Sequence, residues 1–260
     1  MNAQNSFRET IDDDGVVLGA RSMTYSPTVI ESFGILGLDF VWLDFEHGGP
    51  SPWDSELFEH LTRAAEAGGI ELLVRLPSAD PALIRKTLDT GVRNLLIPRV
   101  DSAEEVRSAV KATRFRYDGG PGERGLASGR SRRWGTVDDY VEGEEQTVCL
   151  GVMIEKMTAV DELDEILSVP ELGFVFIGPS DLAVQLGHPT DKTHPDVQDQ
   201  IADIVQQCAD SPVPLGGISH DPDGASNMID AGYQIVRIGG ELESARKTLS
   251  ERLSIVDGSR

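Results

Sequence analysis

The chain is poor in cysteine and lysine and has no long apolar run. Only Cys149 and Cys208 are present, which excludes a disulfide framework and a cysteine-rich metal site, so both are expected to be buried free thiols. No apolar stretch approaches the roughly 20 residues that cross a bilayer. The polar start, residues 1–5, lacks the apolar segment of a signal peptide. We therefore expect a soluble, cytoplasmic protein with no membrane partner.

Positive charge is also scarce. The formal net charge is −21, from 23 Lys and Arg against 44 Asp and Glu, which argues against nucleic acid as a partner. The acidic residues are spread along the chain, whereas an acidic patch for a basic partner predicts clustering. Salt screens the self-repulsion that such a charge causes. The composition therefore indicates a halophilic surface.

Eight short apolar runs rich in strand-forming residues recur along the chain. They are 15–20, 39–43, 71–76, 94–100, 147–154, 173–177, 213–218 and 234–238. Amphipathic stretches suited to helices separate most of them, namely 55–67, 81–90, 103–113, 159–168, 195–209, 221–231 and 241–253. This alternation predicts an α/β fold, a (β/α)8 TIM barrel, in a single domain over residues 1–260. A doubly wound sheet is the main alternative, but no Gly-x-Gly-x-x-Gly turn follows the first strand.

Two segments fall outside this alternation. Residues 1 to about 10 are polar, and we expect them to be loose. Residues from about 115 to 134 are rich in Gly and Arg and show neither the strand nor the helix period. A loop of this length in a compact domain usually covers an active site, so we expect an active-site loop here.

Polar side chains gather at the ends of the expected strands, where the catalytic groups of such barrels lie. These positions hold Asp44, Glu46, His47, Arg75, Arg99, Glu155, Asp181, Ser219 and His220. The second strand is the most informative, because three ionisable residues follow a fully apolar run there, and this indicates chemistry rather than packing. The alternative is that Asp44 caps the next element and His47 is a solvated loop histidine.

Glu155 and Asp181 form the sharpest pair. Each follows an apolar strand, and the two strands are neighbours that open at one mouth. Two carboxylates with further positions open to water and substrate suit Mg²⁺, Mn²⁺ or another hard cation better than a closed zinc site. The alternative is that both residues only cap helix starts, for which Asp181 is well placed.

Three further residues suggest acid–base chemistry on an oxoacid. Arg75 can meet an oxoacid or a developing enolate with two parallel hydrogen bonds, although a buried structural ion pair is its alternative. His47 is suited to act as a general base near neutral pH. Asp89, on the helix after Arg75, is a candidate to orient that imidazole, but the helix could equally expose it.

Taken together, these motifs resemble the HpcH/HpaI aldolase and citrate lyase family, the metal-dependent class II pyruvate aldolases, in the branch that acts on 2-keto-3-deoxy sugar acids. The resemblance covers nearly the whole chain. It runs through residues 40–47, 74–75, 88–91, 96–98, 122–125, 154–155 and 176–182. Each motif alone is weak, and their combination is specific.

The resemblance implies a barrel whose last helix is exchanged between subunits of a homo-oligomer, from dimer to hexamer. It implies a Mg²⁺, Mn²⁺ or Co²⁺ ion held by Glu155 and Asp181. Arg75 would help to stabilise a pyruvate enolate, and His47 would move protons with support from Asp89. Asp44 would belong to the catalytic group. The backbone around Gly178 and Ser180 would bind the pyruvate carboxylate. Met153 and Ile218 would belong to the substrate-binding residues.

One departure from the family pattern concerns Met153. The aldolase branch commonly has Gln two residues before the metal glutamate, where this chain has Met153. A polar contact to pyruvate or to a metal-bound water is then missing. The departure suggests a different acceptor pocket or a member with another activity.

The resulting expectation is a lyase that reversibly cleaves a 4-hydroxy-2-oxoacid, a 2-keto-3-deoxy sugar acid or related diacid, to pyruvate and an aldehyde. A Schiff-base aldolase is disfavoured: of five lysines, only Lys156 lies near the expected site, and its side chain should point opposite to that of Glu155. An acyl-CoA lyase of the malyl- or citramalyl-CoA type stays open, although no basic surface for CoA phosphates is evident. A catalytically silent barrel kept for assembly also stays open, with Met153 as its one hint.

Overall fold

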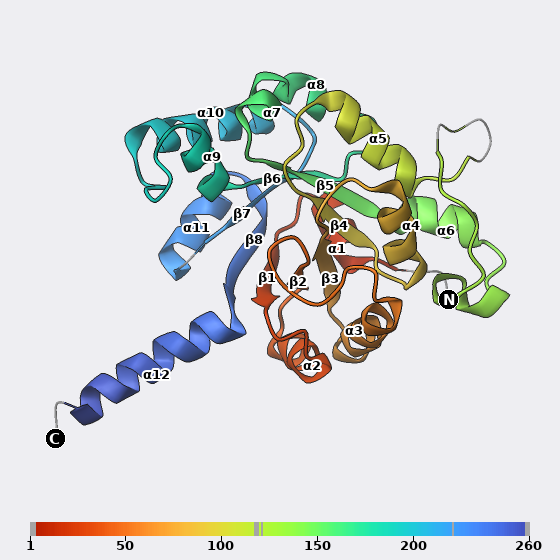
Figure 1. The fold of residues 1–260 in the computed structure, drawn as a ribbon, viewed down its shortest axis with the longest axis horizontal. Helices are drawn as coiled ribbons and strands as arrows, with labels where there is room; N and C mark the ends of the chain where they lie inside the picture. The colour runs from red at the N-terminus through yellow and green to blue at the C-terminus, as the bar shows by residue number, and fades with distance from the viewer. Residues whose placement is uncertain (1–3, 117–119, 121, 220, 258–260) are drawn as a thin grey trace.

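Eight parallel strands close into a barrel in which each strand pairs with its sequence neighbours and β8 pairs with β1 (Figure 1). This computed structural model describes residues 4–116, 120, 122–219 and 221–257. The strands are β1 (Val17–Ser22), β2 (Phe40–Asp44), β3 (Glu71–Arg75), β4 (Asn94–Ile97), β5 (Cys149–Ile154), β6 (Phe174–Ile177), β7 (Leu215–Ile218) and β8 (Tyr233–Gly240). All eight overlap the expected runs, so the prediction of a (β/α)8 barrel is confirmed.

Helices surround the barrel (Figure 1). They are α1 (Ser6–Asp12), α2 (Pro27–Leu36), α3 (Ser55–Gly68), α4 (Pro81–Asp89), α5 (Ala103–Thr113), α6 (Tyr140–Thr147), α7 (Met157–Asp161), α8 (Leu163–Leu167), α9 (Pro179–Gln185), α10 (Pro195–Ala209), α11 (Pro222–Asp230) and α12 (Glu241–Asp257), with a 3₁₀ helix η1 (Arg130–Gly135). The expected helix 159–168 is instead two short helices, because Glu162 leaves the helical conformation between them. The sequence pattern does not indicate α2, in which Ile30 is the one buried residue.

Residues 5–12 form a capped helix, so the prediction of a loose start up to about residue 10 is wrong for residues 5–10, and residues 1–3 lie outside the described part of the chain. Phe7 is fully buried and meets the rings of Phe40 and Phe174 edge-on, with centroids 5.5 and 5.7 Å apart. The Asn5 amide donates to Oδ1 of Asn94 at 2.6 Å. The physical reason is that Phe7 and Ile11 lie on one face of α1 and together close the end of the barrel.

Large inward side chains fill the barrel up to its carboxyl end. The inner cluster contains Phe40, Trp42, Leu73, Leu96, Met153, Phe174, Phe176 and Ile235, together with Phe7 and Ile11 of α1. Gly151 makes room for one of these rings, because a Cβ at this position would lie 2.2 Å from the Phe174 ring. The interior is therefore a packed core, and the inward positions beyond it along each strand are free to carry polar groups.

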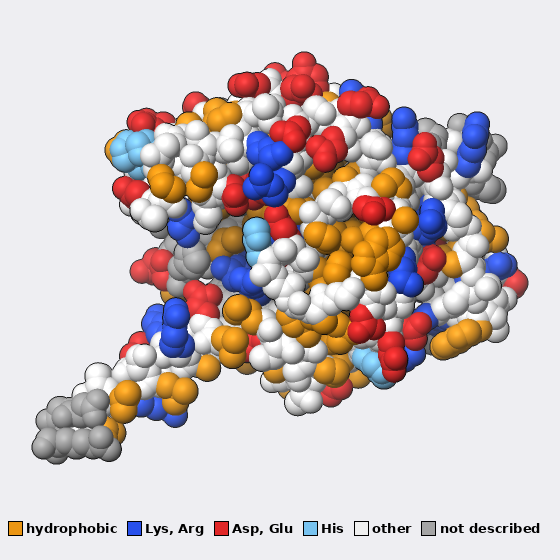
Figure 2. Space-filling view, in the orientation of Figure 1, with side chains coloured by type: hydrophobic (Ala, Val, Ile, Leu, Met, Phe, Trp, Pro, Cys, Tyr) orange, Lys and Arg blue, Asp and Glu red, His pale blue; other side chains and the backbone are white. Residues whose placement is uncertain are grey.

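The last helix, α12, leaves the barrel and projects away from it (Figure 1). It carries exposed apolar side chains, among them Leu249 and Leu253, which are 61% and 57% exposed (Figure 2). Within the described part of the chain, no helix combines the length and apolar character needed to cross a membrane.

Candidate active site

Three strands bring Arg21, Asp44 and Arg75 together at the carboxyl end of the barrel. Asp44 ends β2, directly opposite Arg75 of β3. Its carboxylate accepts from Nε and Nη2 of Arg75 at 2.9 and 2.7 Å and from Nη2 of Arg21 at 2.7 Å. Burial opposes ionisation of Asp44, but the Arg75 hydrogen bonds and the two guanidinium charges outweigh it and lower the pKa. Asp44 is therefore an anion that fixes both arginines.

Glu46 and His47 follow at the same mouth. Oε2 of Glu46 lies 2.8 Å from Nη1 of Arg75, so two carboxylates hold this guanidinium. Burial raises the pKa of Glu46, although the charge of Arg75 opposes the rise. The His47 side chain is 61% exposed, and its Nε2 lies 3.5 Å from Oε2 of Glu46. An accessible imidazole beside a carboxylate is suited to exchange protons with a ligand in the mouth.

Asp89 does not orient His47 in this structure. Its Oδ1 lies 3.7 Å from Nη2 of Arg124, a fully buried side chain that also pairs with Glu144 at 2.8 Å. Among the described residues, no hydrogen bond or ion pair joins Asp89 to His47. The physical reason is that buried Arg124 requires carboxylate partners and takes Asp89 as one of them. The carboxylate beside the imidazole is Glu46 instead.

Glu155 follows β5, and Asp181 lies in the first turn of α9 after β6. Glu155 is buried, and its Oε1 accepts from the backbone N–H of Arg99 at 2.7 Å. Nη1 of Arg99 lies 3.4 Å from Oδ1 of Asp181. Arg99 has a φ of +56°, which few residues other than glycine adopt. One unusual backbone conformation thus lets a single residue contact both carboxylates.

Burial raises the pKa of Glu155 to about 7, and repulsion from Asp181 and Glu46 adds to the rise. Carboxylates gathered in this way repel one another unless a cation joins them. Their oxygens are hard ligands, so the residues present fit a divalent ion such as Mg²⁺ or Mn²⁺. An ion held by these two carboxylates would leave further coordination positions to water and substrate.

The remaining predicted residues line the same mouth. Gly178 lies against the carboxylate of Glu155, because a Cβ here would come within 2.3 Å of its Oε2. Ser180 lies in the first turn of α9, where backbone N–H groups lack intrahelical acceptors. Met153 is buried with its sulfur 3.5 Å from Nη1 of Arg75, and Ile218 is partly buried against the inner core. The last two give the mouth an apolar wall.

A separate group of possible metal ligands lies between α9 and α10. His188, His194 and Asp196 each offer a ligand atom within 4.8 Å of the others. The two imidazoles stack with centroids 3.4 Å apart, and Nε2 of His188 is 3.0 Å from Oδ2 of Asp196. Sequence reasoning does not single out this group. Nitrogen ligands favour transition metals, so its chemistry differs from that of the barrel mouth.

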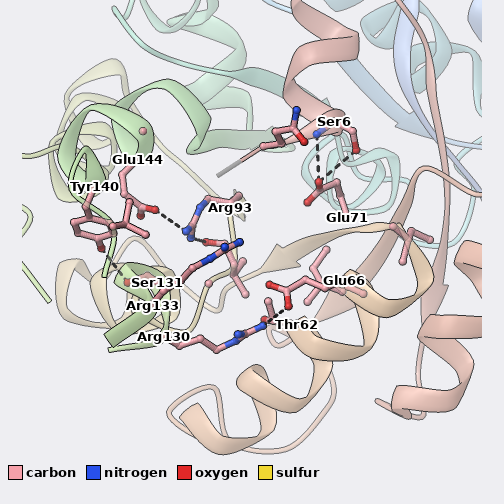
Figure 3. A pocket seen from close by; sticks show the side chains of 18 of the residues that line it. Ser6, Thr62, Glu66, Glu71, Arg93, Arg130, Ser131, Arg133, Tyr140 and Glu144 are labelled. Atoms are coloured by element: carbon pink, nitrogen blue, oxygen red, sulfur yellow. Dashed lines mark hydrogen bonds and ion pairs between the residues drawn. The ribbon is translucent and has the colours of Figure 1, made fainter. Parts of the chain in front are cut away.

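A cavity of about 560 Å³ opens elsewhere, at the amino ends of the strands (Figure 3). Arg93, from the start of β4, pairs with Glu144 at 2.5 Å, and Arg130 of η1 pairs with Glu66 of α3 at 2.6 Å. The described part of segment 115–134 thus packs against α3, α4 and α6. Within one chain, the structure does not support the prediction that this segment covers the active site. The cavity lies at the end of the barrel that usually serves stability.

Sequence reasoning missed two arginines at the mouth. Arg21 lies one residue past the expected end of the first strand, so the predicted boundary hides it. Arg237 lies within the expected last strand, where a single charged residue in an apolar run is the available signal. Its side chain is 9% exposed, on the same strand face as Ile235 of the inner core.

Comparisons with known proteins identify the family of the chain. The chain matches the HpcH/HpaI aldolase/citrate lyase family over residues 21–248. The 2-dehydro-3,6-dideoxy-6-sulfogluconate aldolase of Pseudomonas putida is 30% identical over 242 residues, 93% of this chain and 92% of that protein. The 2-keto-3-deoxy-L-rhamnonate aldolase of Escherichia coli (strain K12) is 32% identical over 259 residues, 98% of this chain and 95% of that protein. The crystal structure of a family protein from Burkholderia cenocepacia J2315 superposes with a TM-score of 0.91 at 29% identity and covers 98% of this chain and 100% of that chain.

Proposed function

Because the chain belongs to the HpcH/HpaI aldolase/citrate lyase family, we propose that it is a carbon–carbon lyase that reversibly cleaves a 4-hydroxy-2-oxoacid of the 2-keto-3-deoxy sugar acid class. The products are pyruvate and an aldehyde. The similar proteins named as sugar acid aldolases support this proposal. The observation that carries it is the placement of a carboxylate-fixed Arg75 and the Glu155–Asp181 pair at one mouth.

Glu155 and Asp181 would hold a divalent cation, Mg²⁺, Mn²⁺ or Co²⁺. When bound, such an ion supplies Lewis-acid polarisation of the substrate's keto group. Arg75 faces the same space and can donate to oxygen atoms on which negative charge develops. The first-turn amides of α9, around Gly178 and Ser180, are available to the carboxylate of the oxoacid. These residues bind and orient the 2-oxoacid end of the substrate.

Cleavage also requires a proton to leave the 4-hydroxyl group. His47, supported by Glu46 at 3.5 Å, would take this proton. The C3–C4 electron pair then becomes part of the enolate of pyruvate, and the aldehyde leaves. A proton returned to C3 completes pyruvate. Glu46 here takes the supporting role that the sequence assigns to Asp89.

A Schiff-base mechanism finds no support at Lys156. Its Nζ lies 2.6 Å from Oδ2 of Asp101, in an ion pair outside the Arg75–Glu155 mouth. An amine engaged in this ion pair is not available to attack a carbonyl group.

Exchange of the pyruvate methyl protons into D2O, followed by NMR, tests enolate formation without knowledge of the aldehyde. We expect exchange that requires Mg²⁺, stops with EDTA and falls at least about 100-fold in Glu155→Ala and Arg75→Ala. Arg63→Ala, at an exposed position on α3, is the matched control. The assay is run in molar KCl because a net charge of −21 favours unfolding at low salt.

Other outcomes would redirect the proposal. Exchange that survives EDTA would point to a Schiff base at Lys156. No exchange with Mg²⁺ demonstrably bound would favour an acyl-CoA lyase or a silent barrel. Calorimetric metal titrations should include His194→Ala, which removes one ligand of the second group and so assigns the heat to the barrel mouth.

We also propose that α12 packs on a second copy of the chain. Leu242, Leu249 and Leu253 recur on one side of this exposed helix. On the barrel itself, Ile35 and Leu36 of α2 are 83% and 75% exposed, as an uncovered contact surface requires. Light scattering should give a dimer or larger oligomer that a double Leu249→Asp, Leu253→Asp variant dissociates. Ser250→Asp is the control, and a monomeric wild-type protein would refute the proposal.

A further inference from the structure

Arg237 is a buried cation, and within the described residues no hydrogen bond from its side chain is found. Its side chain is 9% exposed, and its Nε is buried without a partner. Among the residues that the structure describes, its one ion pair is with Glu243, whose Oε2 lies 4.0 Å from Nη1. Burial lowers the pKa of Arg237, and the charges of Arg21 and Arg75 lower it further. An inward guanidinium left in this state is costly unless a ligand supplies acceptors.

A second guanidinium lies on the neighbouring strand. Arg21 of β1 gives one Nη2 hydrogen bond to Asp44, while its own Nε is buried without a partner. Asp44 is already shared with Arg75, which also pairs with Glu46, so these two carboxylates are occupied by Arg75 and by one Nη2 donor of Arg21. Among the described residues, the Nε donors of Arg237 and Arg21 therefore have no hydrogen-bond partner.

The barrel orders these groups along a possible path for a substrate. Gly178 and Glu155 mark the oxoacid end at β6 and β5. The next strand, β7, pairs with β6 and presents the partly buried Ile218. Ile218 lies directly opposite Arg237 in the β7–β8 register. A carbon chain that starts at the metal carboxylates and crosses the apolar wall thus ends at Arg237.

We propose that Arg237, together with Arg21, binds an anionic group at the end of the substrate remote from the 2-oxoacid. The aldehyde fragment would then carry a carboxylate, sulfonate or phosphate, whose oxygens accept from the unpartnered guanidinium donors. This inference rests on the proposed function and narrows its substrate class to dianions. Arg237 becomes a specificity-determining residue for the aldehyde, separate from the groups that form the enolate.

The test compares aldehydes of equal length in aldol addition with pyruvate at one salt concentration. We expect kcat/KM to be about 10- to 100-fold higher for succinate semialdehyde than for butanal, the usual effect of a hydrogen bond to a charged group. In Arg237→Met this ratio should fall to about one, and in Arg237→Lys to an intermediate value. Arg63→Met is the control and should keep the wild-type ratio. The same kcat/KM ratio, measured for glyceraldehyde 3-phosphate over glyceraldehyde, shows whether phosphate is preferred to carboxylate.

Several outcomes would overturn the inference. A wild-type ratio near one would do so, as would an Arg237→Met protein that keeps the preference or loses activity with both aldehydes equally. Pyruvate proton exchange separates this failure from that of the proposed function, because exchange needs no aldehyde. Titration with succinate, an unreactive dianion, measures binding at this subsite without turnover. Succinate binding at least about 10-fold weaker in Arg237→Met than in the wild type supports the inference, and equal binding opposes it.

Discussion

The carboxylate of Asp44 binds the guanidinium of Arg75 at two points, with Oδ1 2.9 Å from Nε and Oδ2 2.7 Å from Nη2. The β2–β3 register places the two residues directly opposite each other. Arg75 therefore has a fixed orientation before any ligand arrives. A donor that is already oriented loses little entropy when it meets a developing negative charge.

Replacing Asp44 by Asn tests this relationship. A neutral amide cannot balance two guanidinium groups, so we expect the free energy of unfolding to fall by about 3 to 5 kcal/mol. Pyruvate proton exchange should fall on the order of 100-fold in the folded fraction. Denaturant unfolding and NMR measure the two effects. The control is Asp12→Asn, at a position 57% exposed; an unchanged midpoint in Asp44→Asn would contradict the expectation.

Glu155 should make the stability of the metal-free protein depend on pH. Its pKa rises to about 7 from an ordinary 4.5, so the folded protein binds the proton more tightly than the unfolded chain does. Its contribution is present at low pH and is lost as pH rises from about 4.5 through 7. At pH 8 with EDTA, Glu155→Gln should therefore be more stable by about 1 to 3 kcal/mol.

At pH 4 the same pair of proteins should differ little, because Glu155 is then protonated in both the folded and the unfolded state. Added Mg²⁺ should stabilise the wild type and leave Glu155→Gln unaffected. Thermal unfolding at both pH values measures these differences. A stability gain of equal size at pH 4 and pH 8 would show that ionisation is not its cause.

Gly178→Ala should impair the metal site while the barrel still folds. The added Cβ would come within 2.3 Å of Oε2 and 2.7 Å of Cβ of Glu155, so the carboxylate must move. We expect Mg²⁺ affinity to fall about 10- to 100-fold, the usual effect of displacing a ligand or its support. Gly143→Ala, on α6 with open space around it, is the control. Unchanged calorimetric affinity in Gly178→Ala would mean that Glu155 is not a ligand.

Phe7→Ala should destabilise the protein from the opposite end of the barrel. Loss of a fully buried ring that contacts Phe40 and Phe174 should lower the free energy of unfolding by about 3 to 5 kcal/mol. Leu126→Ala, at a position 60% exposed, is the control. Urea unfolding with equal midpoints for both variants would indicate that α1 contributes nothing to the barrel.

The barrel could be predicted from sequence because strand and helix signals alternate over most of the chain. The periodic sequence signal fails for a helix that buries few apolar side chains. In α1 only Phe7 and Ile11 are buried, and in α2 only Ile30, so neither shows the apolar stripe on which helix prediction depends. The structure of α1 instead depends on contacts with strands that come much later in the sequence.

Residues that directly follow a strand could be predicted as site candidates from the sequence. Contacts between residues of strands far apart in the sequence could not. The positions of Glu155 and Asp181 need only the rule that catalytic groups follow the strands. Arg237 comes close to Arg21 because β8 pairs with β1 when the barrel closes. A local sequence pattern cannot predict this pairing. Among the described residues of one chain, Asp89 pairs with Arg124 instead of His47. Arg124 comes from a segment without a regular period, so the sequence pattern does not indicate this pair.

The seal that α1 provides has a consequence for how the chain folds as it is synthesised. Asn5 reaches Thr147, 142 residues later in the sequence, and the Gln234 side chain reaches the carbonyl of Ile11, a separation of 223 residues. Helix α1 therefore cannot complete its contacts until β8, the last of the described strands, has been synthesised. Such distant closures slow folding. Contacts of β8 with α1 thus join segments from opposite ends of the described chain.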